Sequence, residues 1–413
     1  MLPAMAPRTA PPVPSVTTTT PTTAPATTAP ATAALATTGF APFGRTAAVL
    51  AVTALLATSQ LYGMIPLLGS VATDWHTPPA GLTWLVSAFG FGYAAGFLLF
   101  GPLSDRLGRR RVIVAGVAAT AVSTALVALA GSPGPGLALR ALQGLTIGAF
   151  PPVAMAYIGE RVEPHRRLVT VTTMTTGFLA SAVLGQLAAQ GLVATLGWRS
   201  FFLAGAGAFA LAAVALRWAL LPDGPSTGAS PLAAYRAMAT LVRAPGLRLL
   251  YLATPVVLGS FVAVYTGLQL TGTTGLLELR ASALPVILAI PFLTPRLARV
   301  PGPRRIALAL FTAAAGTALV GLLHPGTLLL ALLLMVVTAG IATAAPGLID
   351  TIGSRAGAVR APAVSLFTAL LFVGASLGPQ VAAALTGHGL AALALVLAAL
   401  LGGGALLALA SRR

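Results

Sequence analysis

The stretch GPLSDRLGRRRV, residues 101–112, holds five charged side chains in a chain that is otherwise poor in charge. One acid, Asp105, stands among four arginines. The cluster follows directly on LVSAFGFGYAAGFLLF, residues 85–100, which carries no charge. A basic segment at the end of a long apolar run is typical of a loop that leaves a membrane span on the cytoplasmic side.

The composition of the chain supports a membrane location for these apolar runs. Of the 413 residues, 57% are hydrophobic and only 8% are charged, whereas soluble proteins carry about 25% charged residues. Uncharged stretches of roughly 20 residues, long enough to cross the hydrocarbon core, recur from Thr46 to the C-terminus. Helices satisfy their own backbone hydrogen bonds in lipid. The sequence therefore predicts an all-α membrane protein.

Twelve such spans fit the chain, in two sets of six. The first half, 46–221, has spans at 46–70, 80–102, 111–131, 136–158, 168–192 and 199–221; the second half, 249–413, has spans at 249–271, 274–296, 304–323, 326–349, 359–386 and 389–410.

Two further segments lie outside the spans. Residues 1–45 are rich in Thr, Pro and Ala, a composition typical of a disordered tail. Residues 222–248 predict a cytoplasmic linker with an amphipathic helix. The apolar face expected for this helix consists of Leu232, Tyr235, Met238, Ala239 and Val242.

The placement of positive charge orients the spans. All 24 basic residues are arginines, and this layout puts 21 of them in cytoplasmic segments. Arg199 and Arg280 fall outside, and Arg140 falls within the fourth span. An excess of Arg on cytoplasmic loops is the expected bias, so both termini are expected in the cytoplasm. Because these arginines alternate with apolar runs and form no basic domain, we expect no nucleic-acid partner.

An internal repeat relates the two sets of spans. A shift of 194 residues aligns LSDRLGRRR, residues 103–111, with LARVPGPRR, residues 297–305. The same shift aligns PVAMAYIGER, residues 152–161, with PGLIDTIGSR, residues 346–355. Two pseudo-symmetric halves in the same orientation follow from a shared offset. The second copy of the loop has Arg299 in place of Asp105.

These residues resemble the major facilitator superfamily over about residues 46–410. The opening stretch is similar to that family's loop motif G-x-L-x-D-R-x-G-R-R. RALQG, residues 140–144, resembles the R-x-x-Q-G signature of the twelve-helix bacterial drug–proton antiporter branch. The fifth span departs from that branch, because GFLASAVLGQ, residues 177–186, lacks its Gly-Pro pair.

The resemblance implies a conformational latch at the loop motif. Asp105 would cap helix 11 of the other half whenever the cytoplasmic side is closed, since negative charge is favourable at a helix N-terminus. The alternative is a solvated carboxylate that pairs with a neighbouring arginine. The arginines could equally anchor the spans at anionic headgroups. The candidate latch residues are Gly101, Asp105, Arg106, Gly108, Arg109 and Glu160, with Glu160 as the expected partner of Arg109.

A second set of candidates concerns substrate binding or ion coupling. An ionisable residue inside a span, such as Arg140, is a functional candidate, although it lies near the outer end, where its side chain could reach water. Glu278 is expected to pair with Arg280 or, if it faces the cavity, to carry a proton. Polar side chains in the spans could line the cavity or hydrogen-bond between helices. The full set is Gln60, Tyr62, Tyr93, Arg140, Gln143, Gly144, Gln186, Tyr265, Gln269 and Glu278.

The function implied by the resemblance is secondary active transport by alternating access. We expect proton-coupled export of small hydrophobic or amphipathic compounds by a monomer in the bacterial plasma (inner) membrane. A transporter of a sugar or another small metabolite is the alternative, and a channel is the alternative from a different class. The sequence shows no catalytic, metal-binding or nucleotide-binding constellation, so neither an enzyme nor a cofactor is expected.

Overall fold

A computed structural model describes residues 39–223, 231–289 and 299–411, and the part from Phe40 onward forms one unit. Every regular element in these described residues is a helix, which confirms the all-α prediction. Most of the expected N-terminal tail and residues 224–230 of the expected linker lie outside the described residues.

Helices of the first half follow the expected spans, except that spans 1 and 4 are each divided in two. Gly63 separates the two parts of span 1, which are bent by 45°. The cause is Pro66, which lacks an N–H and whose ring crowds the carbonyl of Tyr62. The elements are α2 Phe43–Tyr62, α3 Met64–Asp74, η1 Pro79–Thr83, α4 Trp84–Leu107, α5 Arg109–Ala128, α6 Pro133–Ile147, α7 Phe150–Arg161, α8 Pro164–Leu196 and α9 Trp198–Ala219.

The second half begins after the linker helix α10. Expected span 274–296 is represented by α12 at its start, and its last residues lie outside the described part. The elements are α10 Pro231–Arg243, α11 Pro245–Leu270, α12 Leu276–Ala281, α14 Gly302–Leu323, α15 Thr327–Arg355, η2 Gly357–Val359, α16 Arg360–Leu385, η3 Thr386–His388 and α17 Gly389–Ala410.

Nine helical stretches in the described residues are long and apolar enough to cross a membrane, or up to ten if the bent pair α2–α3 is one span. The longest stretch, Arg360–Ala410, contains both α16 and α17. A membrane protein is therefore supported. The count of twelve spans stays a prediction.

Small residues bring helices close together within the first half. Helix α8 packs on α2 along Gly177, Ser181 and Gly185. A Cβ on Gly177 would overlap the carbonyl oxygen of Ala51, and the Ser181 hydroxyl is 2.6 Å from that of Thr58. Close approach through small residues is the usual way in which membrane helices gain packing contacts.

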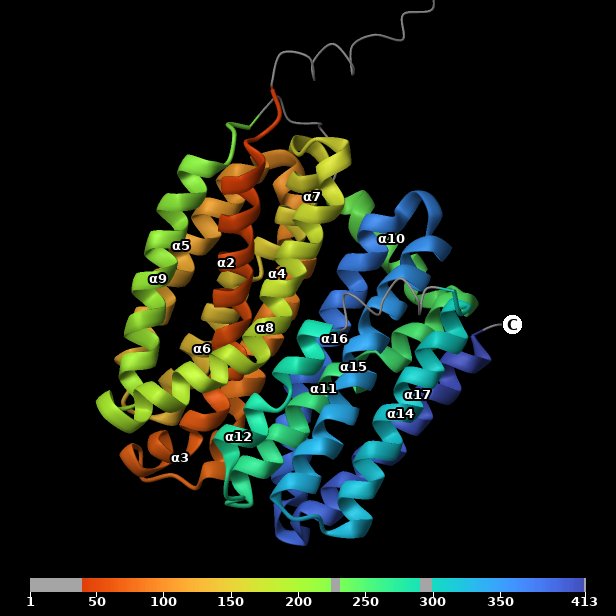
Figure 1. The fold of residues 1–413 in the computed structure, drawn as a ribbon. Coiled ribbons are helices and arrows are strands. Elements are labelled where there is room, and N and C mark those ends of the chain that lie inside the picture. Colours follow the sequence, from red (N-terminus) through yellow and green to blue (C-terminus); the bar gives the residue numbers. More distant parts are fainter. Residues whose placement is uncertain (1–38, 224–230, 290–298, 412–413) are drawn as a thin grey trace, which may run out of the picture. The chain divides into compact units, whose positions relative to one another are not determined.

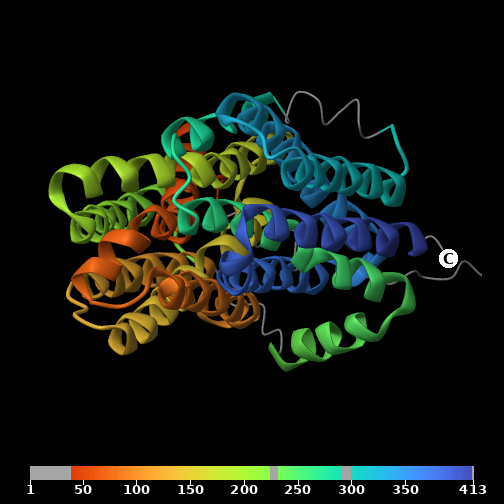
Figure 2. The ribbon, with the colours of Figure 1, turned by 90° about the horizontal axis from the view of Figure 1, so that it is seen from below.

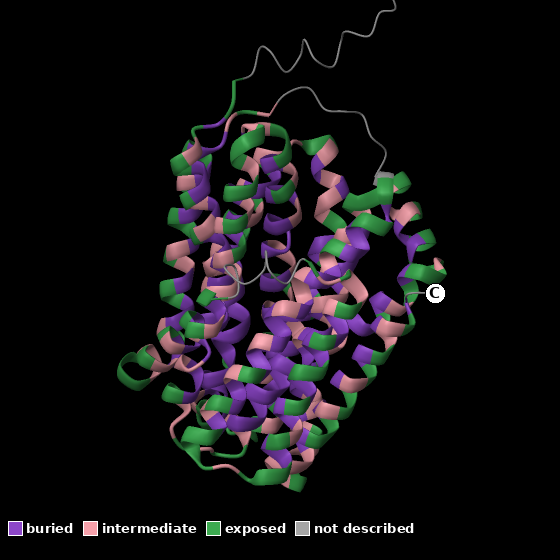
Figure 3. Ribbon diagram, turned by 45° about the vertical axis from the view of Figure 1, so that its right-hand side comes forward, coloured by how far each residue is buried: buried purple, intermediate pink, exposed green. Residues whose placement is uncertain are grey.

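The two halves lie side by side (Figure 2), and α4 and α16 make the most extensive contact between them. Further contacts join α12 to α8 and α3 to α11. We call the end that carries Asp105 and Arg109 the arginine-rich end, and the other end the arginine-poor end. In Figure 1 the ribbons of the halves approach at the arginine-poor end, where α3 and α12 lie, and diverge toward the other end. Buried residues gather where the halves meet (Figure 3).

The linker helix α10 is amphipathic, but its buried face differs from the expected one. Met238 and Leu241 are buried, whereas Leu232 and Val242 are exposed. The Tyr235 hydroxyl donates to the carbonyl of Leu99 over 3.1 Å. The face is rotated because α10 packs against α4, α11 and α16.

Candidate functional site

The loop motif forms a charged network at the arginine-rich end. Arg109, the first residue of α5, forms an ion pair with Asp105 near the end of α4, four residues earlier and across the break at Gly108. Its guanidinium also lies 2.8 Å from Glu160 of α7 and donates to the Ser104 hydroxyl. The expected Arg109–Glu160 pair is therefore present, and the network joins α4, α5 and α7 of the first half.

Asp105 does not cap helix α16 in this structure. No side-chain cap hydrogen bond is made at the N-terminus of α16, where Val359 is the N-cap residue. Gly101 lies at the contact with the second half, since a Cβ there would be 3.8 Å from the Ser365 hydroxyl. Arg106 is exposed. Asp105, Arg109 and Glu160 are thus bonded to one another within the first half in this conformation.

Asp223, just after α9, caps α5. Its two carboxylate oxygens accept the backbone N–H groups of Arg110 over 2.8 Å and Arg111 over 3.1 Å. Gly108 is required here because its φ is +97° and a Cβ would lie 2.5 Å from the Asp223 carboxylate. The glycine of the motif therefore makes room for a carboxylate at the start of the linker, just beyond the last helix of the first half.

Arg140 lies fully buried inside the first half rather than reaching water. It donates to the backbone oxygens of Leu85 over 3.1 Å and Gln60 over 2.9 Å. Its third partner is the Gln143 side chain at 2.5 Å. The rings of Phe89 and Phe202 lie 4.5 Å and 5.7 Å from the guanidinium carbon. Arg140 thus ties α2, α4 and α6 together with no acid as partner.

Gln143 and Gly144 belong to the same packed interior. The Gln143 amide donates to the side chains of Gln60 and Thr124. A Cβ on Gly144 would overlap the carbonyl oxygen of Phe89, so this glycine lets α6 pack against α4. The R-x-x-Q-G residues therefore build the first half.

Aromatic side chains from both halves meet between them. Tyr62 of α2 contacts Phe261 of α11 edge-on at 5.9 Å between ring centroids, and Phe261 contacts Tyr265 at 4.9 Å. Tyr93 of α4 contacts Phe372 of α16 at 4.4 Å. Three of the expected cavity residues thus take part in two groups of aromatic rings, which we together call the aromatic cluster: Tyr62 with Phe261 and Tyr265, and Tyr93 with Phe97 and Phe372.

Hydrogen bonds join α4 and α16 on the arginine-poor side of this cluster. The Ser87 hydroxyl donates to the carbonyl of Ser376. The Gln380 amide donates to the Ser87 hydroxyl over 2.7 Å. Both bonds cross between the halves.

Arg280 of α12 makes a second polar link between the halves. Its Nε donates to Gln186 of α8 over 3.0 Å, and another nitrogen donates to Gln190 of α8. A third donates to Gln269 of α11 over 2.6 Å. Arg280 is only 1% exposed, whereas Glu278 is exposed. The expected Glu278–Arg280 pair is therefore absent, because the guanidinium turns inward to three glutamines.

The carboxylates of the chain all lie near helix ends. The chain has seven acids, Asp74, Asp105, Glu160, Glu163, Asp223, Glu278 and Asp350, and each is in the described part. Glu278 is exposed, and each of the others lies within 4.0 Å of an arginine. The buried Arg140 and Arg280 therefore have no acidic partner.

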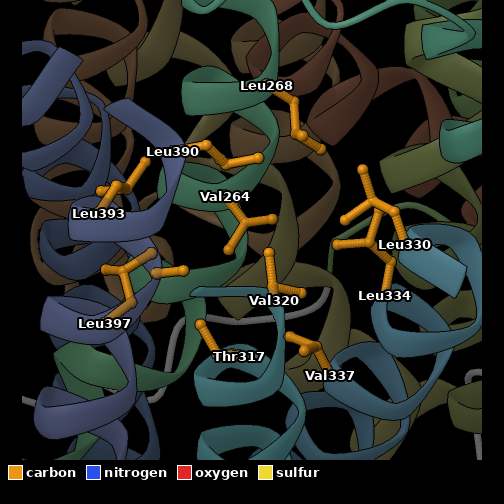
Figure 4. Close-up of a pocket in the computed structure, with 11 residues that line it drawn as sticks. Val264, Leu268, Thr317, Val320, Leu330, Leu334, Val337, Leu390, Leu393 and Leu397 are labelled. Atoms are coloured by element: carbon orange, nitrogen blue, oxygen red, sulfur yellow. The ribbon is translucent and has the colours of Figure 1, made fainter. Parts of the chain in front are cut away.

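Two hollows differ in what they could hold. The cavity in Figure 4, lined by Val264, Leu334 and Leu393 among others, measures about 10 Å³, at the lower limit for one water molecule. It is a packing void of the second half. An open groove of about 650 Å³ runs between α2 and α8, with an apolar lining interrupted by Thr172, Thr173 and Thr176.

Sequence reasoning missed several of these residues. Arg280 was expected at the outer surface, and neither Gln190 nor the cap Asp223 was singled out. One signal for the Arg280 site is present in the sequence. Gln186 and Gln190 lie four residues apart and therefore share a helix face, which indicates that one polar group could contact both. No signal in one sequence pairs Asp223 with Gly108, since 115 positions separate them.

Comparison with known proteins gives partial similarity to several bacterial transporters. The chain is 34% identical to the gallate transporter of Pseudomonas putida over 154 residues. This match covers 37% of the chain and 34% of that protein. It is 28% identical over 226 residues to the inner membrane transport protein YnfM of Escherichia coli, 54% of each chain. The cephamycin export protein CmcT of Amycolatopsis lactamdurans is 32% identical over 163 residues, 38% of the chain and 33% of that protein. The matches thus span at most about half of these three relatives.

A solved structure and a family model cover more of the chain. The crystal structure of a point mutant of a peptide transporter, in complex with sulfate, aligns with a TM-score of 0.70 over 92% of this chain and 97% of that one. At 16% identity, this likeness establishes the fold alone. The model of the Major Facilitator Superfamily matches residues 50–379. Because this match spans most of the sequence, the chain belongs to the Major Facilitator Superfamily.

Proposed function

We propose that this protein is a secondary transporter that moves small amphipathic organic compounds across the bacterial plasma membrane by alternating access. We assign the arginine-rich end and both termini to the cytoplasm, and we propose that the protein acts as a monomer. Export is the proposed direction.

The observation that carries the proposal is the asymmetry of the contacts between the halves. Among the described residues, the hydrogen bonds between residues 40–221 and 245–411 involve Ser87 and Arg280, toward the arginine-poor end. The charged network at the other end stays within the first half. Such an arrangement supports an outer side that is closed and a latch that is available for the opposite state.

The chemistry of the surfaces supports an amphipathic substrate. The cluster between the halves offers aromatic rings and the hydroxyls of Tyr62, Tyr93 and Tyr265. The groove between α2 and α8 combines apolar side chains with threonine hydroxyls. Sites with mostly apolar walls and a few polar groups are typical for small molecules.

The energy source that we propose is an ion gradient, with the proton gradient as the first to test. We assign no proton carrier, because all seven carboxylates lie near helix ends.

The experiment is transport into everted membrane vesicles across a panel of amphipathic compounds. We expect energised vesicles with the protein to accumulate at least one compound above vesicles without it, and a protonophore to abolish the difference. Accumulation that the protonophore leaves unchanged would exclude proton coupling. If no compound accumulates in vesicles of either orientation, the transport proposal fails.

Uptake of a small metabolite is a second candidate. It is favoured by the similarity to the gallate transporter of Pseudomonas putida, together with a buried Arg280 that lacks an acid. Accumulation of an aromatic acid in right-side-out vesicles, and its absence from everted ones, would select this candidate over export.

A further inference from the structure

Arg280 is a buried cation whose partners are all neutral and are shared between the two halves. Gln186 and Gln190 belong to α8 of the first half, and Gln269 belongs to α11 of the second. Arg140, the other arginine that is buried among the described residues, has its three hydrogen-bond partners within the first half. Any separation of the halves at the arginine-poor end therefore breaks bonds of Arg280 and leaves those of Arg140 intact.

Two of the three bonds of Arg280 would be lost on that separation. The donors that now face Gln186 and Gln190 would have no partner, while Gln269 would remain beside them on the same half. A desolvated guanidinium favours an anion that accepts several of its N–H groups. None of the seven carboxylates of the chain pairs with Arg280.

One face of α11 connects this guanidinium to the aromatic cluster. Phe261, Tyr265 and Gln269 follow each other at intervals of four residues, so their side chains lie along one stripe of the helix. The Tyr265 ring is 4.9 Å from that of Phe261. Its buried hydroxyl has no hydrogen-bond partner within the described part of the chain. Rings, a free hydroxyl and a cation thus follow one another toward the arginine-poor end.

We propose that Arg280 recognises the carboxylate of a small aromatic carboxylic acid, whose ring lies against Phe261 and Tyr265. The proposal rests on the second candidate function, uptake of a small metabolite from the outer side, and names its substrate class. In the closed state, Gln186 and Gln190 occupy the donors that the carboxylate takes in the open state.

The test is isothermal titration of the purified full-length protein with benzoate and with benzamide at neutral pH. The two compounds share a ring and nearly a size, and they differ in charge. We expect benzoate to bind at least about tenfold more tightly, since hydrogen bonds to charged groups are the stronger ones. Arg280→Gln should remove the preference for benzoate and change the dissociation constant of benzamide by no more than about twofold. Arg280→Lys should keep part of the preference for benzoate.

Arg199→Gln is the matched control, because Arg199 also lies at the arginine-poor end but is paired with Asp74. It should leave both affinities unchanged. Equal weakening of both compounds by Arg280→Gln would make Arg280 a gate without a role in recognition, and would overturn the proposal. Equal affinity of the unaltered protein for both compounds, or binding of neither, would overturn it as well.

A second variant keeps the test decisive if Arg280→Gln does not fold, as judged by size-exclusion chromatography. The double change Gln186→Leu and Gln190→Leu retains the cation and removes its partners on α8. We expect this variant to bind benzoate more tightly, and weaker binding would contradict the proposal. Failure of the transport function can be distinguished from failure of this proposal. In that case benzoate would bind as expected, yet no compound would accumulate in vesicles of either orientation.

Discussion

Asp223 accepts the backbone N–H of Arg110 over 2.8 Å, so that a residue shortly beyond α9, the last helix of the first half, caps α5, the helix that begins within the loop motif. Gly108 makes this contact sterically possible. A Cβ at position 108 would lie 2.5 Å from the Asp223 carboxylate, at a φ of +97° that L-residues rarely adopt.

The first prediction concerns this cap. Asp223→Ala should destabilise the protein by about 1 kcal/mol, as loss of a helix cap usually does. Gly108→Ala should cost about 1–3 kcal/mol through backbone strain and the clash. Thermal unfolding of the detergent-purified protein measures both.

Gly101→Ala is the control for the glycine substitution. A Cβ there meets nothing closer than 3.8 Å, and alanine favours a helix, so the melting temperature should hold or rise. An equal drop in melting temperature for Gly101→Ala and Gly108→Ala would contradict the role given to Asp223.

The second prediction concerns the latch. Asp105→Asn removes the ion pair with Arg109 and the charge proposed to cap α16 in the opposite state. We expect transport to fall to less than about a tenth, at an unchanged protein level. A loss of about 1.4 kcal/mol in the stability of the cytoplasmically closed state would change its population by that factor. Vesicle transport with immunoblotting measures this.

Asp350→Asn is the control, because Asp350 is also an acid paired with an arginine, Arg305, although it is more exposed than Asp105. Transport should stay near that of the unaltered protein. Near-normal transport by Asp105→Asn would eliminate the latch.

The third prediction concerns Arg140. Arg140→Gln leaves the carbonyls of Leu85 and Gln60 without their donors. The expected loss of stability is roughly 2–6 kcal/mol, since each of the two buried unsatisfied acceptors costs about 1–3 kcal/mol. A thermal shift in detergent would show it, with Arg199→Gln as the surface comparison. A melting temperature unchanged by Arg140→Gln would mean that this network does not hold α2 and α4 together.

The fourth prediction uses the absence of cysteine from the chain. A Cβ on Gly90 would lie 3.3 Å from the Cβ of Ser376, slightly below the range for a disulfide. A shift of a few tenths of an ångström would bring the two Cβ atoms into this range. The pair Gly90→Cys and Ser376→Cys should thus form a disulfide on oxidation and hold α4 against α16. We expect transport to stop and to return on reduction. Full transport by the fully oxidised protein would mean that these helices need not separate here.

Much of the fold could be predicted from the sequence because apolar length and arginine placement are local signals. The pairing of Arg109 with Glu160 could also be predicted, because the expected layout puts both residues at the cytoplasmic ends of their spans. Arg280 could not be predicted in the same way. Its charge suggested the membrane surface, and only the packing of α12 against α8 turns it inward. The Asp223 cap and the rotated face of α10 also depend on contacts between segments distant in sequence.

The bridge from Arg280 to three glutamines has a consequence for the conditions in which the protein works. Amides do not titrate, and arginine keeps its charge over the whole physiological range. Buried contacts are also screened little by salt, whereas the half-exposed Arg109–Glu160 pair is weakened by it. In our orientation, the side that meets a variable environment is sealed by bonds insensitive to acid and salt. The side on which the Asp105 and Glu160 carboxylates pair with Arg109 faces the cytoplasm. The cell itself controls the composition of that compartment.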